Sequence, residues 1–257
     1  MNRVPFRAVI VDFDRTLLHT DKTISEYTVK VMREWHDAGA HLFAATARPE
    51  RTIGAYCEKI PFDAFTTLNG ARTVTPDAVF EEPISLQSAD SVLAQLCAIN
   101  GMVISAETGS GFFANTEIPA WSPVVTDDIR QLPRKEKIYK ILASHPRLPA
   151  DQISVDMPDD TYSSVAEMKL LQVMSGTATK WNGIRKMLEA YRLDASCAIY
   201  FGDDNDDIGP IRECGCGVAV GNALESVRKI ADHVTRSNDE DGVAFFLSWL
   251  ARNQISF

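Results

Sequence analysis

Short apolar runs and amphipathic helical segments alternate in the first part of the chain. Residues 6–11 form a continuous apolar run, which is typical of a strand covered by helices on both faces. Residues 25–38 carry apolar side chains at helical spacing, with Ser25 as the N-cap and Gly39 as the stop. Residues 40–45 are again apolar, and another helix is expected up to about residue 59. This order of elements predicts a parallel sheet with right-handed crossovers.

The same alternation returns near the end of the chain, and a different pattern separates the two stretches. The late elements are expected to be helices at 180–191, 223–231 and 242–252 and strands at 197–201 and 217–220. In between, residues 88–98 predict a helix, and the alternating pattern of 102–116 predicts antiparallel strands and hairpins. We therefore expect an α/β fold, a doubly wound Rossmann-like sheet formed by residues 1–80 and 175–257, with an inserted α+β domain at 81–174.

Polar side chains gather at the ends of three of the predicted core strands. Asp12 and Asp14 follow the first strand, Thr46 and Arg48 follow the second, and Gly202 leads from a late strand into four aspartates. In open α/β sheets, ligands bind outside the carboxyl ends of the strands. The convergence of these polar ends therefore predicts a binding site at one edge of the sheet.

The late acidic segment contains Asp203, Asp204, Asp206 and Asp207 within five positions. Carboxylates packed this closely raise one another's pKa unless a cation neutralises them. A solvent-facing acidic turn is one interpretation. The position after a buried strand, matching that of Asp12 and Asp14, instead favours a site for a hard cation such as Mg²⁺, which takes one or two carboxylates and keeps places for water and phosphate.

Thr46 and Lys180 add a hydroxyl and an ammonium group to the same predicted edge. Together with a metal and a helix N-terminus, these groups make a cradle for one phosphoryl group. Such a site needs an attacking atom, and a carboxylate beside the metal supplies it by forming an aspartyl-phosphate.

Four motifs, in order, resemble those of the haloacid dehalogenase superfamily of phosphatases. They are Asp12-Phe13-Asp14-Arg15-Thr16-Leu17, Thr46, Lys180 and the run 202–207. Three further segments, NGA at 69–71, 217–235 and 238–244, resemble the Cof-type branch, whose large α+β cap is inserted between the second and third motifs. The resemblance covers essentially the whole chain, although the cap is matched by size and placement alone.

The resemblance implies roles for the acidic residues. Asp12 would be the nucleophile that takes the phosphoryl group. Asp14 would protonate the leaving alcohol and then deprotonate the attacking water. Asp12, the backbone carbonyl of Asp14 and Asp203 would bind Mg²⁺, while Asp207 would orient metal-bound waters from outside the direct ligand set.

The same resemblance implies how the phosphate and the leaving group are held. Thr46 and Lys180 would bind the phosphate oxygens, with Arg48 as a further candidate. The cap would close over the substrate, exclude bulk water and contact the leaving group. Specificity is expected in the cap, with residues 108–121 as the candidate segment.

Three positions depart from the family pattern. Arg15 and Ala47 stand where glycine is common, and Asp206 stands in an asparagine position. A shifted register would make Asn205 and Asp206 the motif pair, but the unshifted one keeps Asp203 and Asp207 four residues apart. We hypothesise that Arg15 or Arg48 neutralises Asp206, whose charge would otherwise repel phosphate.

The predicted function is a Mg²⁺-dependent phosphatase acting on a small phosphorylated metabolite, with a sugar phosphate as the expected substrate. A phospho-acceptor signalling domain shares the acidic strand end but is roughly half this length and lacks a cap. A degenerate member that binds a phosphometabolite without turnover remains open because of the three departures. A phosphomutase also remains open, because an aspartyl-phosphate can return its phosphoryl group to a sugar.

Composition narrows the partners and the location. The net charge of −9 argues against nucleic acid and anionic membranes as main partners, since both require clustered cations. No apolar run approaches the ~20 residues of a membrane span. The five cysteines lack zinc-site spacing and predict reduced thiols, so a cytoplasmic location is expected. The oligomeric state is left open.

Overall fold

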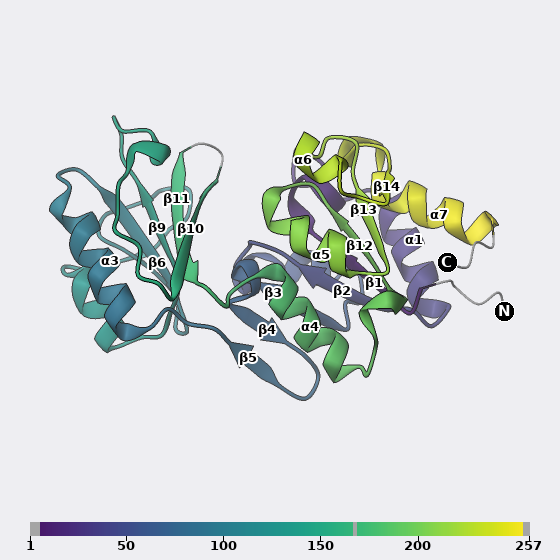
Figure 1. Ribbon diagram of the computed structural model, residues 1–257, viewed down its shortest axis with the longest axis horizontal. Helices are drawn as coiled ribbons and strands as arrows, with labels where there is room; N and C mark the ends of the chain where they lie inside the picture. The colour runs from purple at the N-terminus through teal and green to yellow at the C-terminus, as the bar shows by residue number, and fades with distance from the viewer. Residues whose placement is uncertain (1–5, 167–168, 254–257) are drawn as a thin grey trace. The chain divides into compact units, whose positions relative to one another are not determined.

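The computed structural model describes residues 6–166 and 169–253 of the chain. Its internal contacts divide the protein into two compact units, one formed by residues 1–80 and 179–257 and the other by residues 81–178 (Figure 1). The second unit is thus one continuous insertion within the first. The role of this second unit as a cap that covers the substrate stays a prediction.

The first unit is built on one eight-stranded sheet in the order β14-β13-β12-β1-β2-β3-β4-β5. The strands are β1 (Ala8–Val11), β2 (His41–Ala45), β3 (Ala64–Thr67), β4 (Arg72–Val74), β5 (Val79–Glu81), β12 (Ala198–Gly202), β13 (Cys216–Ala219) and β14 (His233–Val234). β1 lies between β12 and β2 and is parallel to both, with Val11 beside Phe201 and Ala44. The predicted α/β fold with a doubly wound parallel sheet is confirmed.

Helices cover this sheet, as the continuous apolar strands require. They are α1 (Glu26–Asp37), α2 (Gly54–Cys57), α4 (Lys180–Ala190), α5 (Ile208–Glu213), α6 (Glu225–Arg228) and α7 (Gly242–Asn253). α1 packs beside α7, and α4 beside α5 (Figure 1). Ser25 caps α1 by accepting a hydrogen bond from the Thr28 amide. All four residues of β1 are buried, because helices shield both of its faces.

Two predicted helices are shorter than expected. The one expected up to residue 59 is a 3₁₀ turn at Glu50–Thr52 followed by the single turn of α2, with Ile53 between them. The one expected at 223–231 contains only α6. The Leu224 amide donates to the carbonyl of Asp203 at 2.9 Å, and the Asp232 amide donates to that of Gly217 at 2.9 Å, so both ends are tied to strand ends.

The second unit is a mainly antiparallel sheet, with a parallel pair of strands at one edge, and a helix on one face. Its strands, in the order β10-β11-β9-β6-β7-β8, are β6 (Val103–Thr108), β7 (Phe112–Ala114), β8 (Val124–Val125), β9 (Ile138–Ser144), β10 (Thr161–Ala166) and β11 (Leu170–Ser175). α3 (Leu86–Ala98) packs its buried side chains onto one sheet face, where Leu93, Ile104 and Val173 share a core. The predicted helix at 88–98 and hairpin at 102–116 are both present, the latter as β6 and β7.

Two further properties concern membrane insertion and the state of the cysteines. Within residues 6–166 and 169–253, no helix is long and apolar enough to cross a bilayer. All five cysteines are free thiols, and burial raises the pKa of both Cys214 and Cys216 to about 12. These two thiols are therefore neutral and unreactive near pH 7.

Candidate active site

Three neighbouring parallel strands end at one edge of the core sheet and deliver the predicted polar residues there. Asp203 follows β12, Asp12 follows β1 and Thr46 follows β2. All three are buried, with 4% of Asp12, 4% of Asp203 and 1% of Thr46 exposed. Backbone hydrogen bonds extend the strand pairing to this point, since the Asp12 amide donates to the carbonyl of Phe201 at 3.0 Å. The sheet therefore sets the spacing of these side chains.

Lys180 joins the acidic residues at the first position of α4. Oxygens of Asp12, Asp203 and Asp207 lie within 4.8 Å of one another. The Lys180 ammonium donates to Asp12 Oδ1 at 2.8 Å and to Asp207 Oδ1 at 2.6 Å. Three buried carboxylates and one buried ammonium group form a cluster with an excess of negative charge.

Asp207 is held by four donors. Besides Lys180, the Tyr200 hydroxyl donates to Oδ1 at 2.5 Å, and the amides of Asp203 and Asp204 donate to Oδ2 at 2.8 and 3.0 Å. Although its oxygens are close enough to share a cation, these bonds use its acceptor capacity. Asp207 thus fixes Lys180 and the turn after β12, and it leaves Asp12 and Asp203 as the carboxylates able to accept a metal.

The protonation of the cluster reflects this burial. Burial, and next the charges of Asp207 and Asp203, raise the pKa of Asp12 well above its ordinary value, although Lys180 opposes the shift. Burial and Asp207 also raise the pKa of Asp203 to about 7. Burial alone would lower the pKa of Lys180, but Asp12 and Asp207 outweigh it and hold that pKa well above normal. A further cation would stabilise the ionised carboxylates.

Asp14 points to a different set of partners. Arg48 Nε donates to its Oδ2 at 2.6 Å and Arg48 Nη2 to its Oδ1 at 2.8 Å, while Lys22 Nζ donates to Oδ1 at 2.8 Å. Burial raises the pKa of Asp14, but the bonds from Arg48 and Lys22 outweigh it and lower that pKa overall. Arg48, a candidate phosphate ligand from the sequence, thus lies on the predicted acid/base residue.

The backbone explains two of the departures from the family pattern. Arg15 has a φ of +59°, in the left-handed region where glycine is unstrained, so an arginine there costs about 1 kcal/mol. Its Nε lies 3.6 Å from Asp203 Oδ2, and the Asn222 amide donates to its carbonyl at 2.8 Å. Ala47 does not have a positive φ, so alanine fits that position without strain.

Asp206 has a contact that the sequence did not suggest. The side-chain amide of Asn69, in the turn after β3, donates to Asp206 Oδ2. The two guanidinium groups expected to neutralise Asp206 face other carboxylates, with Arg48 on Asp14 and Arg15 on Asp203. The amide itself adds no positive charge, whereas Lys180 interacts electrostatically with Asp206, whose negative charge helps to raise the pKa of the lysine.

Comparison with known proteins identifies the family of this chain. The sequence model of the haloacid dehalogenase-like hydrolases matches residues 9–247, which include every site residue described above. The chain belongs to the haloacid dehalogenase-like (HAD-like) hydrolases. A similar protein is the 5-amino-6-(5-phospho-D-ribitylamino)uracil phosphatase YitU of Bacillus subtilis (strain 168), which is 26% identical over 265 residues, covering 93% of this chain and 95% of YitU.

Solved structures of similar fold include two phosphatases. BT1666 from Bacteroides thetaiotaomicron has a TM-score of 0.83 at 24% identity, covering 95% of this chain and 94% of that one. The HAD subclass IIB sugar phosphatase BT4131 has a TM-score of 0.81 at 20% identity, covering 95% and 98%. The predicted family and the prediction of an enzyme of the phosphatase class are confirmed.

The donor set of this HAD-like hydrolase fits a divalent metal. Asp12 and Asp203 offer hard carboxylate oxygens within 4.8 Å of each other, and the Thr16 hydroxyl donates to Asp203 Oδ1 at 3.1 Å and orients that carboxylate. The raised pKa values of both aspartates are what a site built around an added cation shows before the cation binds. Phosphatases of this family generally use a divalent metal.

Sequence reasoning missed several residues that complete this site of the HAD-like hydrolase. They are Thr16, Lys22, Asn69 and Tyr200, which bond to Asp203, Asp14, Asp206 and Asp207 respectively. Thr16 lies in the first motif and Asn69 in the NGA segment, so the sequence marked both positions but did not indicate what either side chain binds. Tyr200 lies in the apolar pattern of β12, and Lys22 lies in a polar turn, where neither pattern marks a functional residue.

Gly202 is required by the close approach of Asp207. A Cβ at this position would lie 2.5 Å from the Cβ and Cγ of Asp207, so the carboxylate that fixes Lys180 would be displaced. Gly202→Ala is expected to destabilise the fold by ~1–3 kcal/mol and to lower phosphatase activity at least tenfold. Thermal unfolding and phosphate release measure both effects. Gly54→Ala, where a Cβ meets nothing within 4 Å, is the matched control, and equal losses in both variants would contradict the account.

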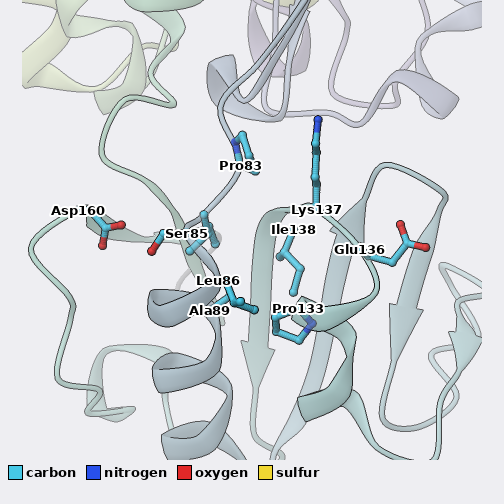
Figure 2. A pocket seen from close by; sticks show the side chains of 10 residues that line it. Pro83, Ser85, Leu86, Ala89, Pro133, Glu136, Lys137, Ile138 and Asp160 are labelled. Atoms are coloured by element: carbon cyan, nitrogen blue, oxygen red, sulfur yellow. The ribbon is translucent and has the colours of Figure 1, made fainter.

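The second unit contains a cavity of about 340 Å³ near the start of α3. Figure 2 shows Ser85 and Asp160 on one side of it and Pro133, Glu136 and Lys137 on the other. The lining thus comes from the start of α3, from the segment leading into β9 and from Asp160. The candidate specificity segment at 108–121 does not contribute to this lining.

Proposed function

We propose that the protein is a Mg²⁺-dependent phosphatase that hydrolyses a small phosphorylated metabolite, a sugar phosphate, through a phosphoryl group carried by Asp12. The observation that carries this proposal is the buried contact of Asp12 with Lys180 at 2.8 Å, beside Asp203. A carboxylate placed at the end of the central strand, with a cation on one oxygen, leaves its other oxygen available for attack on phosphorus.

In this mechanism each polar group has a distinct part. Asp12 attacks phosphorus, the ester bond breaks, and Asp14 donates a proton to the departing alkoxide. Lys180 binds a phosphate oxygen while Asp207 holds its ammonium in place, and Thr46 offers its hydroxyl to a second oxygen. Asp14 then takes a proton from water, which attacks the phosphoryl group on Asp12 and regenerates the carboxylate. A Mg²⁺ ion held by Asp12, the Asp14 carbonyl and Asp203 would neutralise charge on the phosphoryl group.

Asp14 must gain a proton before it acts as an acid. In the substrate-free protein its two donors, Arg48 and Lys22, favour the carboxylate. A substrate that draws these donors toward its own oxygens weakens their hold and raises the pKa of Asp14. Substrate binding and protonation of Asp14 are therefore coupled in this proposal.

The substrate class is supported by the names of similar proteins. YitU is a phosphatase of a phosphorylated ribitylamino compound, and BT4131 is described as a sugar phosphatase. Both names describe phosphate esters of polyhydroxylated carbon chains. Free thiols at all five cysteines support the proposed cytoplasmic location, where such metabolites would be met.

The test is a panel of phosphorylated metabolites assayed for phosphate release with Mg²⁺ and with a chelator. We expect Mg²⁺-dependent release from p-nitrophenyl phosphate and faster release from at least one sugar phosphate. Release that is independent of divalent metal would contradict the proposed cofactor. Conversion of a sugar phosphate into its positional isomer without release would instead identify a phosphomutase.

Metal binding is expected to weaken below neutral pH. The pKa of Asp203, raised from 3.8 to about 7 without metal, means that the folded protein holds this proton more tightly than the unfolded chain. Stability of the metal-free protein therefore falls as pH rises between these two values, and Mg²⁺, which binds the carboxylate, offsets that loss. The increase in Tm produced by Mg²⁺ should be larger at about pH 8 than at about pH 5.5. An equal increase at both pH values would contradict this linkage, and Asp203→Asn should abolish the difference.

A further inference from the structure

Lys22 lies in a tight turn shortly after the nucleophile, and its backbone is strained. The His19 amide donates to the carbonyl of Thr23 at 2.9 Å and the Lys22 amide to that of His19 at 2.9 Å, which closes the turn. Lys22 has a φ of +68°, in the left-handed region that favours glycine or asparagine. A lysine at such a position costs about 1 kcal/mol relative to glycine. A function of the lysine side chain would explain why this cost is tolerated.

Tyr56 organises Lys22 together with Arg48. Its hydroxyl donates to the Lys22 carbonyl at 3.0 Å, and its ring lies under the Arg48 guanidinium, 5.4 Å from Cζ to the ring centroid. The ring of Phe13 packs edge-on against Tyr56 at 5.4 Å. One aromatic side chain therefore contacts both cationic residues that bind Asp14, through the backbone of Lys22 and the guanidinium of Arg48.

The two cations exceed what Asp14 requires. Arg48 alone already donates to both oxygens of this carboxylate, at 2.6 and 2.8 Å, which is the strong bidentate arrangement. Lys22 adds a second positive charge, so the group of three carries one net positive charge. Within residues 6–166 and 169–253, Asp14 is the hydrogen-bond acceptor of the Lys22 ammonium, and the Lys22 side chain is 49% exposed. Two of its three donors are therefore available to a ligand.

We propose that Lys22 is a substrate-recognition residue that selects leaving groups carrying an anionic substituent, a carboxylate or a second phosphate, close to the ester oxygen. The inference rests on the proposed function, because Asp14 must meet the leaving oxygen in order to protonate it. An ammonium 2.8 Å from Asp14 then lies beside the substituents of that same leaving group. In a protein of net charge −9, an excess cation at this place matches a leaving group that brings its own negative charge.

The experiment compares two esters that differ in one group. In glycerol 2-phosphate the leaving alcohol is neutral, whereas in 2-phosphoglycerate one CH₂OH is replaced by a carboxylate. We expect the wild type to favour 2-phosphoglycerate in kcat/KM by about tenfold, and Lys22→Met to remove this preference mainly by raising KM. Lys22→Arg should restore most of it, because the cation returns. Glycerate 2,3-bisphosphate, as a third substrate, shows whether a second phosphate is preferred over the carboxylate alone.

Lys30→Met serves as the matched control, because Lys30 lies on α1 with 73% of its side chain exposed and should leave the substrate ratio unchanged. If Lys22→Met lowers kcat equally for both esters, Lys22 only positions Asp14 and the inference is overturned. A wild type that hydrolyses p-nitrophenyl phosphate but does not favour the anionic ester also overturns it, while leaving the proposed function intact. Absence of turnover of every ester, p-nitrophenyl phosphate included, overturns the proposed function and this inference with it.

Discussion

Asp12→Asn is expected to lower kcat for p-nitrophenyl phosphate by a factor on the order of 10⁴ or more, because an amide cannot attack phosphorus. The change keeps the shape of a side chain that is only 4% exposed. It also removes a charge that burial and two neighbouring carboxylates disfavour. The fold should therefore persist, which thermal unfolding by circular dichroism checks alongside phosphate release.

Asp14→Asn is the informative companion to this variant. p-Nitrophenolate leaves without needing a proton, so phosphoryl transfer to Asp12 should still occur. Hydrolysis of the phosphorylated enzyme, which needs a base for water, should be slow. A burst of p-nitrophenol followed by slow turnover in Asp14→Asn, and no burst in Asp12→Asn, is the expected pair of results. A burst in both variants would remove Asp12 from the nucleophile's role.

Lys180→Met is expected to harm both stability and catalysis. The ammonium is 4% exposed and contacts Asp12 and Asp207, so its loss leaves two buried carboxylates without their cation. Breaking a buried ion pair in this way costs ~3–5 kcal/mol, and losing one donor to the transferring phosphate costs roughly 10²–10³ in kcat. Urea unfolding and kcat for p-nitrophenyl phosphate measure the two effects.

The matched control is Lys229→Met, since Lys229 is the C-cap residue of α6, has 71% of its side chain exposed and pairs with Glu225 at 3.6 Å. It should change stability by less than about 1 kcal/mol. If Lys180→Met were as stable and as active as Lys229→Met, the cluster of Asp12, Asp207 and Lys180 could not be the centre of the site.

The predicted site residues that the structure brings to one sheet edge share one cause. Asp12, Thr46 and Asp203 each follow a continuous apolar run, and parallel strands bring their ends to one edge. Lys180 was found through its place at the start of a helix with a clear apolar period. The positions of these residues depend on the local hydrophobic pattern and on the topology of the sheet. Both can be predicted from the amino-acid sequence.

The remaining features depend on side-chain direction and on backbone detail. The sequence made Arg48 a candidate phosphate ligand. In the structure its guanidinium donates two hydrogen bonds to the carboxylate of Asp14. The preference for glycine at the position of Arg15 follows from a backbone φ of +59°, which the sequence does not show. Asn69 reaches Asp206 from the turn after β3, a strand that no pattern had marked. Long side chains have several low-energy directions, and tertiary contacts choose among them.

The most direct test of the central claim is to locate the phosphoryl group on the protein. Asp14→Asn is mixed with p-nitrophenyl phosphate and Mg²⁺, quenched in acid during the slow phase, and digested for mass spectrometry. The account predicts one added phosphoryl group on the peptide that contains Asp12, lost in alkali as an acyl phosphate is, and absent when Asp12 is also asparagine. A phosphoryl group on another residue, or phosphate release that persists with no labelled peptide, would contradict it.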